Sequence, residues 1–287
     1  MNIQGFIDLH THGISSFDTR TGNPDHILKM SALHGAAGTG AILPTIYSAS
    51  PAVMRKNMEA VRKAMEVQKS EGDNRSAYIL GVHIEGPFLN PLRCGALDKG
   101  SFAKPALPVL MKLIDGYEDI IKIMTVAPEI PGALRVIERC RELGIKVNMG
   151  HSDATYEEAL KGKKAGATGI THLFNAMRPF HHREPGLAGL GLVDEDIYIE
   201  VIADRYHLHP LTLELIFNRK RLDRIILVSD SVKGIGKKTR PAYKGKILAG
   251  SGITISDSVK VLDDIGVPEA EIIEAAKDNP ARYISLQ

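Results

Sequence analysis

The chain has 287 residues, a formal net charge of +2 and two cysteines, Cys94 and Cys140, that form no pairing motif. A charge so close to neutrality favours neither nucleic acid nor an acidic membrane surface as a partner, and unpaired cysteines suit a reducing compartment. The sequence contains neither a signal-peptide pattern nor the roughly 18 consecutive apolar residues of a membrane helix. We therefore expect a cytoplasmic protein that acts on a small molecule, built as one domain over residues 1–287.

Short apolar segments recur along the chain and predict eight strands. In chain order they end at or near Gly13, Thr45, Pro87, Val126, Ser152, His172, Asp204 and Asp230. Amphipathic patterns between them predict helices at 51–69, 131–143 and 154–165. Two more helical patterns follow the last strand, at 256–265 and at 268–278, and the second is expected to end before Asn279-Pro280.

This alternation of strands and helices predicts an α/β fold with a parallel sheet, and eight such units predict closure into a (β/α)8 TIM barrel, which needs about 250 residues. An open, doubly wound sheet is the alternative. Such a sheet concentrates its ligands at one switch point, whereas here reactive residues follow many different strands.

The first group of candidate site residues lies at the ends of the first and third strands, on the face where a barrel builds its active site. His10 and His12 point to the same side of their strand because side chains alternate along it. Glu85 ends the third strand, and glutamate is rarely buried without a partner. Ordinary polar positions for the histidines and a salt bridge for Glu85 are the simpler interpretations.

Later strands end in His151, His172 and Asp230. With Glu85, the two histidines supply two imidazoles and one carboxylate with an open position, as a hydrolytic metal site requires. Asp230 would take a proton from a metal-activated water and deliver it to a leaving group. A hydrogen-bonded core histidine and a helix-capping aspartate are the alternatives.

Three residues in polar loops are candidates for substrate contact. Arg183 follows two histidines in a loop too polar for the core, and its guanidinium suits a phosphate or carboxylate. Asp204 and His207 follow the seventh strand and are placed to face the same cavity. Solvated surface positions are the alternative for all three.

In this order, the motifs resemble those of the N-acetylglucosamine-6-phosphate deacetylases of the amidohydrolase superfamily. The most specific are His-Ile-Glu-Gly-Pro-Phe at 83–88, Thr-His-Leu-Phe-Asn-Ala-Met at 171–177 and Arg-Glu-Pro-Gly at 183–186. The resemblance extends over nearly the whole chain. It implies metal-dependent hydrolysis of the acetamide of N-acetylglucosamine 6-phosphate to glucosamine 6-phosphate and acetate.

The resemblance also implies residue roles. Glu85, His151 and His172 would hold the catalytic divalent metal, His10 and His12 would support a second metal position, and Asp230 would be the general acid and base as well as a ligand. The one or two ions would be zinc, with iron, manganese or cobalt as alternatives. Residues that would meet the amino-sugar phosphate are Ala96, Asn175, Ala176, Asp204, His207, Leu248, Ala249 and Gly250. Arg183 would bind the phosphate, often of a neighbouring subunit, which implies a homodimer.

Three departures from the family pattern are present. Most or all of the small β-sandwich domain usual in the family is expected to be missing. Leu97 stands where the family has a histidine that contacts the substrate, and Arg205 stands where it has glycine. The two substitutions leave a different N-acyl amino sugar or small amide open as the substrate. The sequence also leaves open a non-catalytic sugar-phosphate-binding relative and a metal-dependent phosphoesterase on the same barrel.

Overall fold

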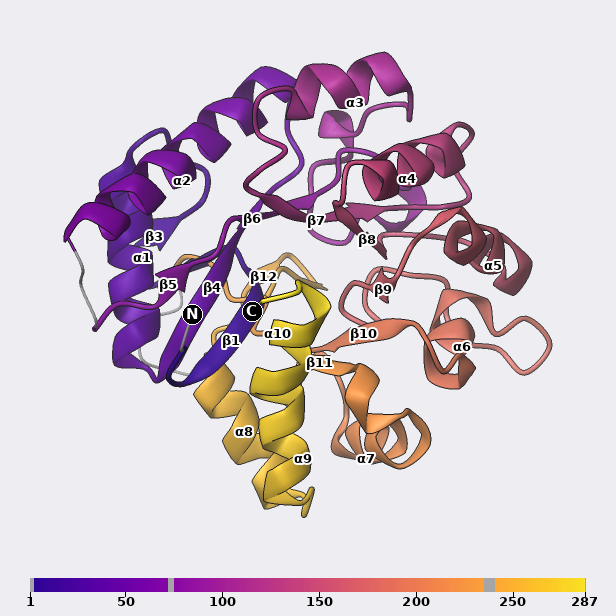
Figure 1. The fold of residues 1–287 in the computed structure, drawn as a ribbon. Helices are drawn as coiled ribbons and strands as arrows, with labels where there is room; N and C mark the ends of the chain where they lie inside the picture. Colours follow the sequence, from indigo (N-terminus) through magenta and orange to yellow (C-terminus); the bar gives the residue numbers. More distant parts are fainter. Residues whose placement is uncertain (1–2, 72–74, 235–240, 287) are drawn as a thin grey trace.

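The computed structural model describes residues 3–71, 75–234 and 241–286. Eight parallel strands follow one another around the centre in chain order, with helices outside them (Figure 1). The strands are β1 Phe6–Thr11, β4 Thr39–Ile46, β6 Val82–Glu85, β7 Ile121–Val126, β8 Lys146–Met149, β9 Gly169–Ile170, β10 Tyr198–Val201 and β11 Ile225–Leu227. A short strand, β5 Tyr78–Ile79, pairs in parallel with the first half of β4.

The barrel closes where the chain beyond β11 pairs with β1. The Asp230 N–H donates to the His10 carbonyl at 2.8 Å, and the His12 and Gly13 N–H groups both donate to the Ser231 carbonyl at 2.9 Å. Thr11 and Ser231 form a parallel bridge. The expected (β/α)8 barrel is therefore confirmed over the open sheet.

The outer layer contains both helices that the sequence pattern predicts and helices that it does not. Confirmed are α2 Pro51–Glu71, α4 Ala133–Glu142, α5 Tyr156–Ala165 and α8 Ile255–Asp264. The additional ones are α1 Pro24–Ala36, α3 Leu107–Ile114, α6 Gly186–Val193 and α7 Pro210–Arg219. Helix α5 begins with a capping box, in which Thr155 and Glu158 satisfy each other's backbone N–H groups.

The last helical pattern does not end before Asn279-Pro280, as the sequence led us to expect. Helix α9 (Glu269–Ile273) continues through a π-helical turn, Glu274–Asp278, into α10 (Asn279–Tyr283). A proline inside a helix lacks an N–H and crowds the carbonyl of the preceding turn, and the wider π turn accommodates it. The Asn279 amide also donates to the carbonyls of Leu222 and Ile225, at 2.7 and 2.8 Å, which holds the helix against β11.

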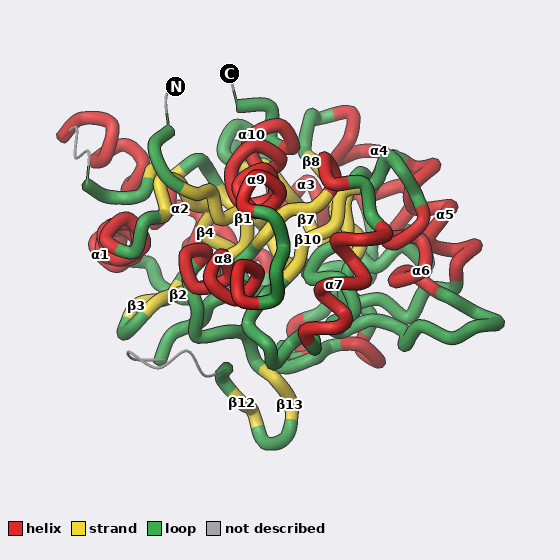
Figure 2. Tube along the Cα trace, turned by 90° about the horizontal axis from the view of Figure 1, so that it is seen from below, coloured by secondary structure: helices red, strands yellow, loops and turns green. Residues whose placement is uncertain are grey.

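Two apolar cores hold the fold together. One lies between the strands and the outer helices, and the other fills the barrel and includes Leu9, Leu43, Ile123 and Val228, with Tyr283 of α10 at its edge. Figure 2 shows α10 and both chain ends at one end of the barrel, and the hairpin of β12 (Tyr243–Lys244) and β13 (Ile247–Leu248) at the other. A second hairpin, β2 Gly13–Ile14 with β3 Phe17–Asp18, follows β1.

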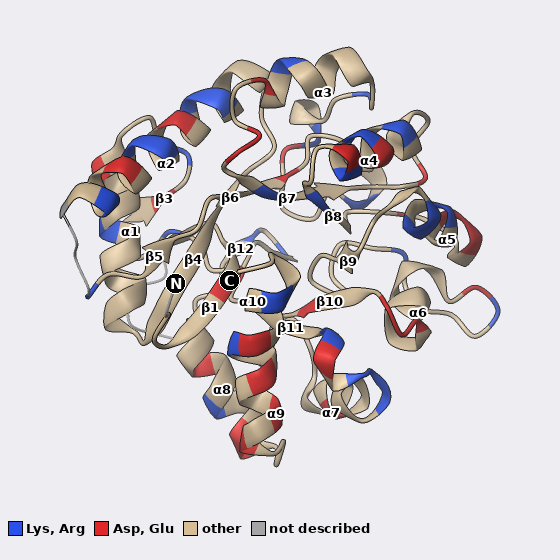
Figure 3. Ribbon diagram, viewed as in Figure 1, with Lys and Arg blue, Asp and Glu red and all other residues tan. Residues whose placement is uncertain are grey.

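Charged residues are concentrated on the outer helices. Lys, Arg, Asp and Glu are mixed along α2, α4 and α5 (Figure 3), as is usual for helix faces that contact water. Within the described residues, no helix combines the length and the apolarity needed to cross a membrane.

Candidate active site

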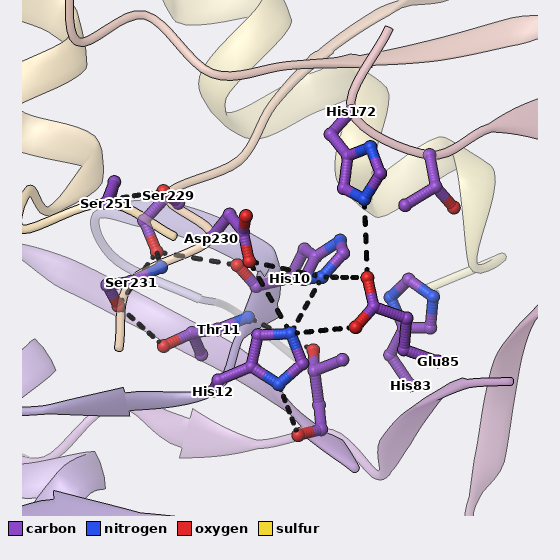
Figure 4. Close-up of polar contacts among 12 residues, drawn as sticks. His10, Thr11, His12, His83, Glu85, His172, Ser229, Asp230, Ser231 and Ser251 are labelled. Carbon is purple, nitrogen blue, oxygen red and sulfur yellow. Dashed lines mark hydrogen bonds and ion pairs between the residues drawn. The ribbon is translucent and has the colours of Figure 1, made fainter. Parts of the chain in front are cut away.

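The C-terminal ends of five strands bring six ligand-type side chains together. His10 belongs to β1 and His12 directly follows it, Glu85 ends β6, and His151, His172 and Asp230 follow β8, β9 and β11. Figure 4 shows His10, His12, Glu85 and Asp230 pointing toward one another.

Three of these residues have a left-handed backbone, with φ of 46° at His151, 32° at His172 and 47° at Asp230. Such a conformation costs a non-glycine residue about 1 kcal/mol or more. The strain is retained where the chain turns sharply at a strand end and directs the side chain into the site.

One cluster consists of Glu85, His151 and His172. The Glu85 Oε1 atom lies 3.1 Å from His151 Nε2 and 3.3 Å from His172 Nε2, and the two Nε2 atoms are 3.2 Å apart. All three side chains are buried.

The second cluster consists of His10, His12 and Asp230. The two Nε2 atoms are 3.3 Å apart, and each lies 3.5 Å from Asp230 Oδ1. Glu85 joins the clusters, because its Oε1 is 3.5 Å from His10 Nε2 and its Oε2 is 3.3 Å from His12 Nε2. One carboxylate is thus shared by four imidazoles.

These spacings fit divalent metal ions. With bonds of about 2.1 Å to nitrogen and oxygen, neighbouring donor atoms of a tetrahedral shell are about 3.4 Å apart. The donor atoms of both clusters are separated by 3.1 to 3.5 Å. The donor set of imidazole nitrogens and carboxylate oxygens is one that divalent transition metals accept.

Hydrogen bonds behind the site orient three of the histidines. The Nδ1 atom of His10 donates to Glu200 Oε2 at 2.9 Å, that of His12 to the Thr45 carbonyl at 3.0 Å, and that of His151 to the Arg93 carbonyl at 2.9 Å. Because these partners are acceptors only, each of these imidazoles keeps a proton on Nδ1 and directs its Nε2 atom at the cluster. His172 differs, since its buried Nδ1 has no partner within the described residues.

The electrostatics of the site favour an ionised Glu85. Burial by itself would raise the pKa of this carboxyl, but His151 and His12 beside it hold the pKa well below its usual range. Burial would likewise lower the pKa of His10, yet the Glu200 carboxylate raises it well above the ordinary value. Metal binding to His10 would therefore have to displace a proton.

A cavity of about 830 Å³ opens above the clusters. The residues predicted to meet the substrate that line it are Ala96, Asn175, Ala176, His207, Leu248, Ala249 and Gly250. Asp204 lies behind His207 and accepts a hydrogen bond from His207 Nδ1 at 2.7 Å. Arg183 is exposed, contacts His182 Nε2 at 3.2 Å and does not line this cavity.

The structure adds site residues that sequence reasoning missed. The Tyr47 ring stacks on His12 with centroids 3.8 Å apart, the Arg20 guanidinium carbon lies 4.4 Å above Tyr47, and both side chains line the cavity. Glu200 was also missed. It is a lone charge inside the apolar run Ile-Tyr-Ile-Glu-Val-Ile, and that exception to the pattern was the available signal.

Leu97 and Arg205 are the two residues that differ from the family pattern near the substrate, and only one of them faces the cavity. Leu97 lines it. The expectation that Arg205 alters the sugar pocket is wrong, because its Nη2 pairs with Asp264 Oδ2 of α8 at 2.7 Å and its side chain does not line the cavity. Arg205 has a φ of 67°, which explains why glycine suits this position.

We accordingly expect Arg205→Gly to leave kcat/KM for the substrate within about twofold. The variant loses an exposed ion pair worth about 0–1 kcal/mol and relieves a left-handed non-glycine residue, so its Tm should change by only a few degrees. Steady-state kinetics and thermal unfolding measure both quantities, with Leu97→His as the comparison inside the cavity. A kcat/KM altered more than tenfold in Arg205→Gly would show that the residue acts on the pocket after all.

A closed barrel with one carboxylate shared between two imidazole clusters defines a metal-dependent hydrolase. The sequence matches the amidohydrolase family over residues 3–256. It is 34% identical to N-acetylglucosamine-6-phosphate deacetylase of Lysinibacillus sphaericus over 99% of this chain and 76% of that protein. It is 30% identical to N-acetylgalactosamine-6-phosphate deacetylase of Escherichia coli O157:H7 over 98% of this chain and 77% of that protein.

Solved structures agree with the sequence matches. The structure of a mutant N-acetyl-D-glucosamine-6-phosphate deacetylase of Mycobacterium smegmatis in complex with N-acetyl-D-glucosamine 6-phosphate superposes with a TM-score of 0.88 at 28% identity, over 99% of this chain and 78% of that chain. The Thermotoga maritima deacetylase gives 0.87 at 29% identity, over 99% and 79%. The chain therefore belongs to the N-acetylglucosamine-6-phosphate deacetylase family of amidohydrolases.

Proposed function

We propose that this chain hydrolyses the acetamide of N-acetylglucosamine 6-phosphate to glucosamine 6-phosphate and acetate. The observation that carries the proposal is the complete ligand set around Glu85, with Asp230 beside it, at the floor of a cavity large enough for a sugar phosphate. Two relatives that align with 98% and 99% of this chain are named for the deacetylation of N-acetylgalactosamine 6-phosphate and of N-acetylglucosamine 6-phosphate.

Glu85, His151 and His172 would hold the catalytic ion, and His10, His12 and Asp230 the second one. A bound divalent ion supplies a Lewis acid that lowers the pKa of a water molecule and polarises the amide carbonyl. Zinc suits these ligands best, and iron, manganese and cobalt are the alternatives.

Asp230 moves the proton. It accepts a proton from the attacking water as the new C–O bond forms, and donates it to the amide nitrogen as the C–N bond breaks. The products are a free amine on the sugar and acetate. His207 faces the same cavity, and Asp204 behind it raises its pKa against the effect of burial, which favours a cationic imidazole beside the sugar phosphate.

The direct test is acetate release by metal-loaded protein from N-acetylglucosamine 6-phosphate, with N-acetylgalactosamine 6-phosphate and unphosphorylated N-acetylglucosamine alongside. Among these three compounds, we expect N-acetylglucosamine 6-phosphate to have the highest kcat/KM. If folded, metal-loaded protein released no acetate from any of them, the proposal would be wrong. Release mainly from the galacto epimer, or from other N-acyl amino sugars, would favour the second candidate, which Leu97 in the cavity wall supports.

We further propose a single-domain, cytoplasmic homodimer in which Arg183 binds the phosphate held by the neighbouring subunit. Its exposure, away from the cavity of its own chain, supports this arrangement. Loss of an arginine from a phosphate contact should raise KM about tenfold or more, because charge-assisted bonds contribute about 1.5–3 kcal/mol.

Subunit complementation tests the arrangement sharply. Arg183→Ala and Asp230→Asn would each impair every site in a pure dimer, but a mixed dimer would contain one site with both groups intact. At a substrate concentration below the wild-type KM, mixing the two impaired variants with subunit exchange should therefore restore activity to about a quarter of the wild-type level. Activity that stays at the sum of the separate variants would place Arg183 outside the neighbouring site.

A further inference from the structure

We propose that Tyr283, on α10 at the opposite end of the barrel from the site, is a positioning residue for the metal ligand His10. It acts through Asn148 and Glu200. The inference rests on the metal-dependent site proposed above and extends it to a helix beyond the residues 3–256 that match the family.

A continuous line of hydrogen bonds connects the two ends of the barrel. The Tyr283 hydroxyl donates to Asn148 Oδ1 at 2.5 Å, Asn148 Nδ2 donates to Glu200 Oε1 at 2.7 Å, and His10 Nδ1 donates to Glu200 Oε2 at 2.9 Å. All four side chains are at most 3% exposed. Water therefore cannot readily replace a missing member of the line.

The Tyr283 hydroxyl and the Glu200 carboxylate together fix the orientation of the Asn148 amide. An amide has one accepting end and one donating end, and the Glu200 carboxylate needs the donating end. With a hydroxyl donor at Oδ1, the NH2 group is directed at Glu200. The opposite orientation would place Oδ1 against a buried carboxylate, so Tyr283 stabilises the arrangement in which Glu200 is fully hydrogen-bonded.

The neighbouring strand leaves room for this contact. A Cβ atom on Gly169 of β9 would lie 2.2 Å from Asn148 Oδ1 and 2.6 Å from the Tyr283 hydroxyl oxygen. A larger residue at this position would force one or both of these atoms to move. Thr168 Oγ1 lies 3.0 Å from the same hydroxyl oxygen and can donate to it while Tyr283 donates to Asn148.

This line of hydrogen bonds ends at His10, which belongs to the cluster with His12 and Asp230. Glu200 orients His10, whereas His151 is oriented by the Arg93 carbonyl from a different loop. A change at Tyr283 should therefore weaken the His10 position and leave the Glu85, His151 and His172 position as it is.

Tyr283→Phe removes the hydroxyl and keeps the ring, whose centroid lies 4.7 Å from that of Tyr198. Tyr198→Phe is the matched control, because it removes a hydroxyl from the same ring pair but outside the line to His10. Metal-free proteins would be titrated with Co²⁺ and followed by visible absorption. In Tyr283→Phe we expect the affinity of one of the two Co²⁺ binding events to fall about tenfold. This is the lower end of the range for residues that hydrogen-bond to a metal ligand. In Tyr198→Phe we expect neither affinity to change.

A second variant distinguishes a loss of His10 orientation from a general loss of protein stability. Glu200→Gln removes the acceptor of His10 directly and should weaken the same binding event by up to about 100-fold, and adding Tyr283→Phe to it should cost little more. The proposal is overturned if Tyr283→Phe binds Co²⁺ like the wild type, if both events weaken together with a lower Tm, or if the wild type binds a single ion. Because Co²⁺ binding is measured without substrate, its outcome is independent of the acetate-release assay.

Discussion

Asp230→Asn is expected to lower kcat for acetate release about 10³-fold, with little change in KM. A positioned acid and base contributes about 10²- to 10⁴-fold, and an asparagine of nearly the same shape can neither accept the proton of the water nor return it to the nitrogen. Since Glu85, His151 and His172 form a separate cluster, the variant should retain the metal ion held there. Steady-state kinetics and metal analysis of the same preparation measure both effects.

Asp204→Asn is the matched control for this prediction. Asp204 is a buried aspartate just past the end of β10, but it pairs with His207 and contacts neither metal cluster. Its loss should act mainly on KM, through the charge on His207. If Asp230→Asn kept kcat within tenfold of the wild type, another group would have to carry the proton, and the assignment of Asp230 would fail.

The second large effect is expected at Glu85. Glu85→Gln should lose more than about 100-fold in metal affinity, which is beyond the range typical of groups behind the ligands, and the activity should fall with the metal content. The two carboxylate oxygens lie 3.1 to 3.5 Å from four imidazole nitrogens, and a neutral amide removes the negative charge that the ions require. Elemental analysis after dialysis, together with acetate release at increasing zinc concentration, measures the loss.

Glu158→Gln provides the control for Glu85→Gln. Glu158 belongs to the capping box of α5, where a glutamine can also accept the backbone N–H. It should retain wild-type metal content, activity and Tm. A Glu85→Gln protein that kept two ions through dialysis would rule out the shared-ligand role of Glu85.

The barrel, the shared position of the site residues and helix α5 were predictable because each depends on short sequence patterns. Apolar runs followed by polar residues mark where strands end, and in a barrel all parallel strands end on one face. Residues as far apart as His10 and Asp230 could therefore be assigned to one site without knowledge of any contact between them. Helix α5 was likewise predictable, because its cap, amphipathic stripe and terminal glycine lie within a dozen residues.

The orientation of individual side chains was not predictable in the same way. Arg205 belongs to a strand-end motif, yet it turns toward Asp264, 59 residues further along the chain. The helix through Pro280 continues because Asn279 is held by carbonyls beside β11, whereas the local proline signal predicted a break.

The same reason applies to the line from Tyr283 to His10. Tyr283 and Asn148 are 135 positions apart, and Glu200 and His10 are 190 apart. Local patterns were sufficient for the barrel, the ligand types and the family, since each depends on periodicity or on short motifs. The pairing of buried polar groups depends on which distant strands and helices the closed barrel brings into hydrogen-bond distance, and that is a property of packing in three dimensions.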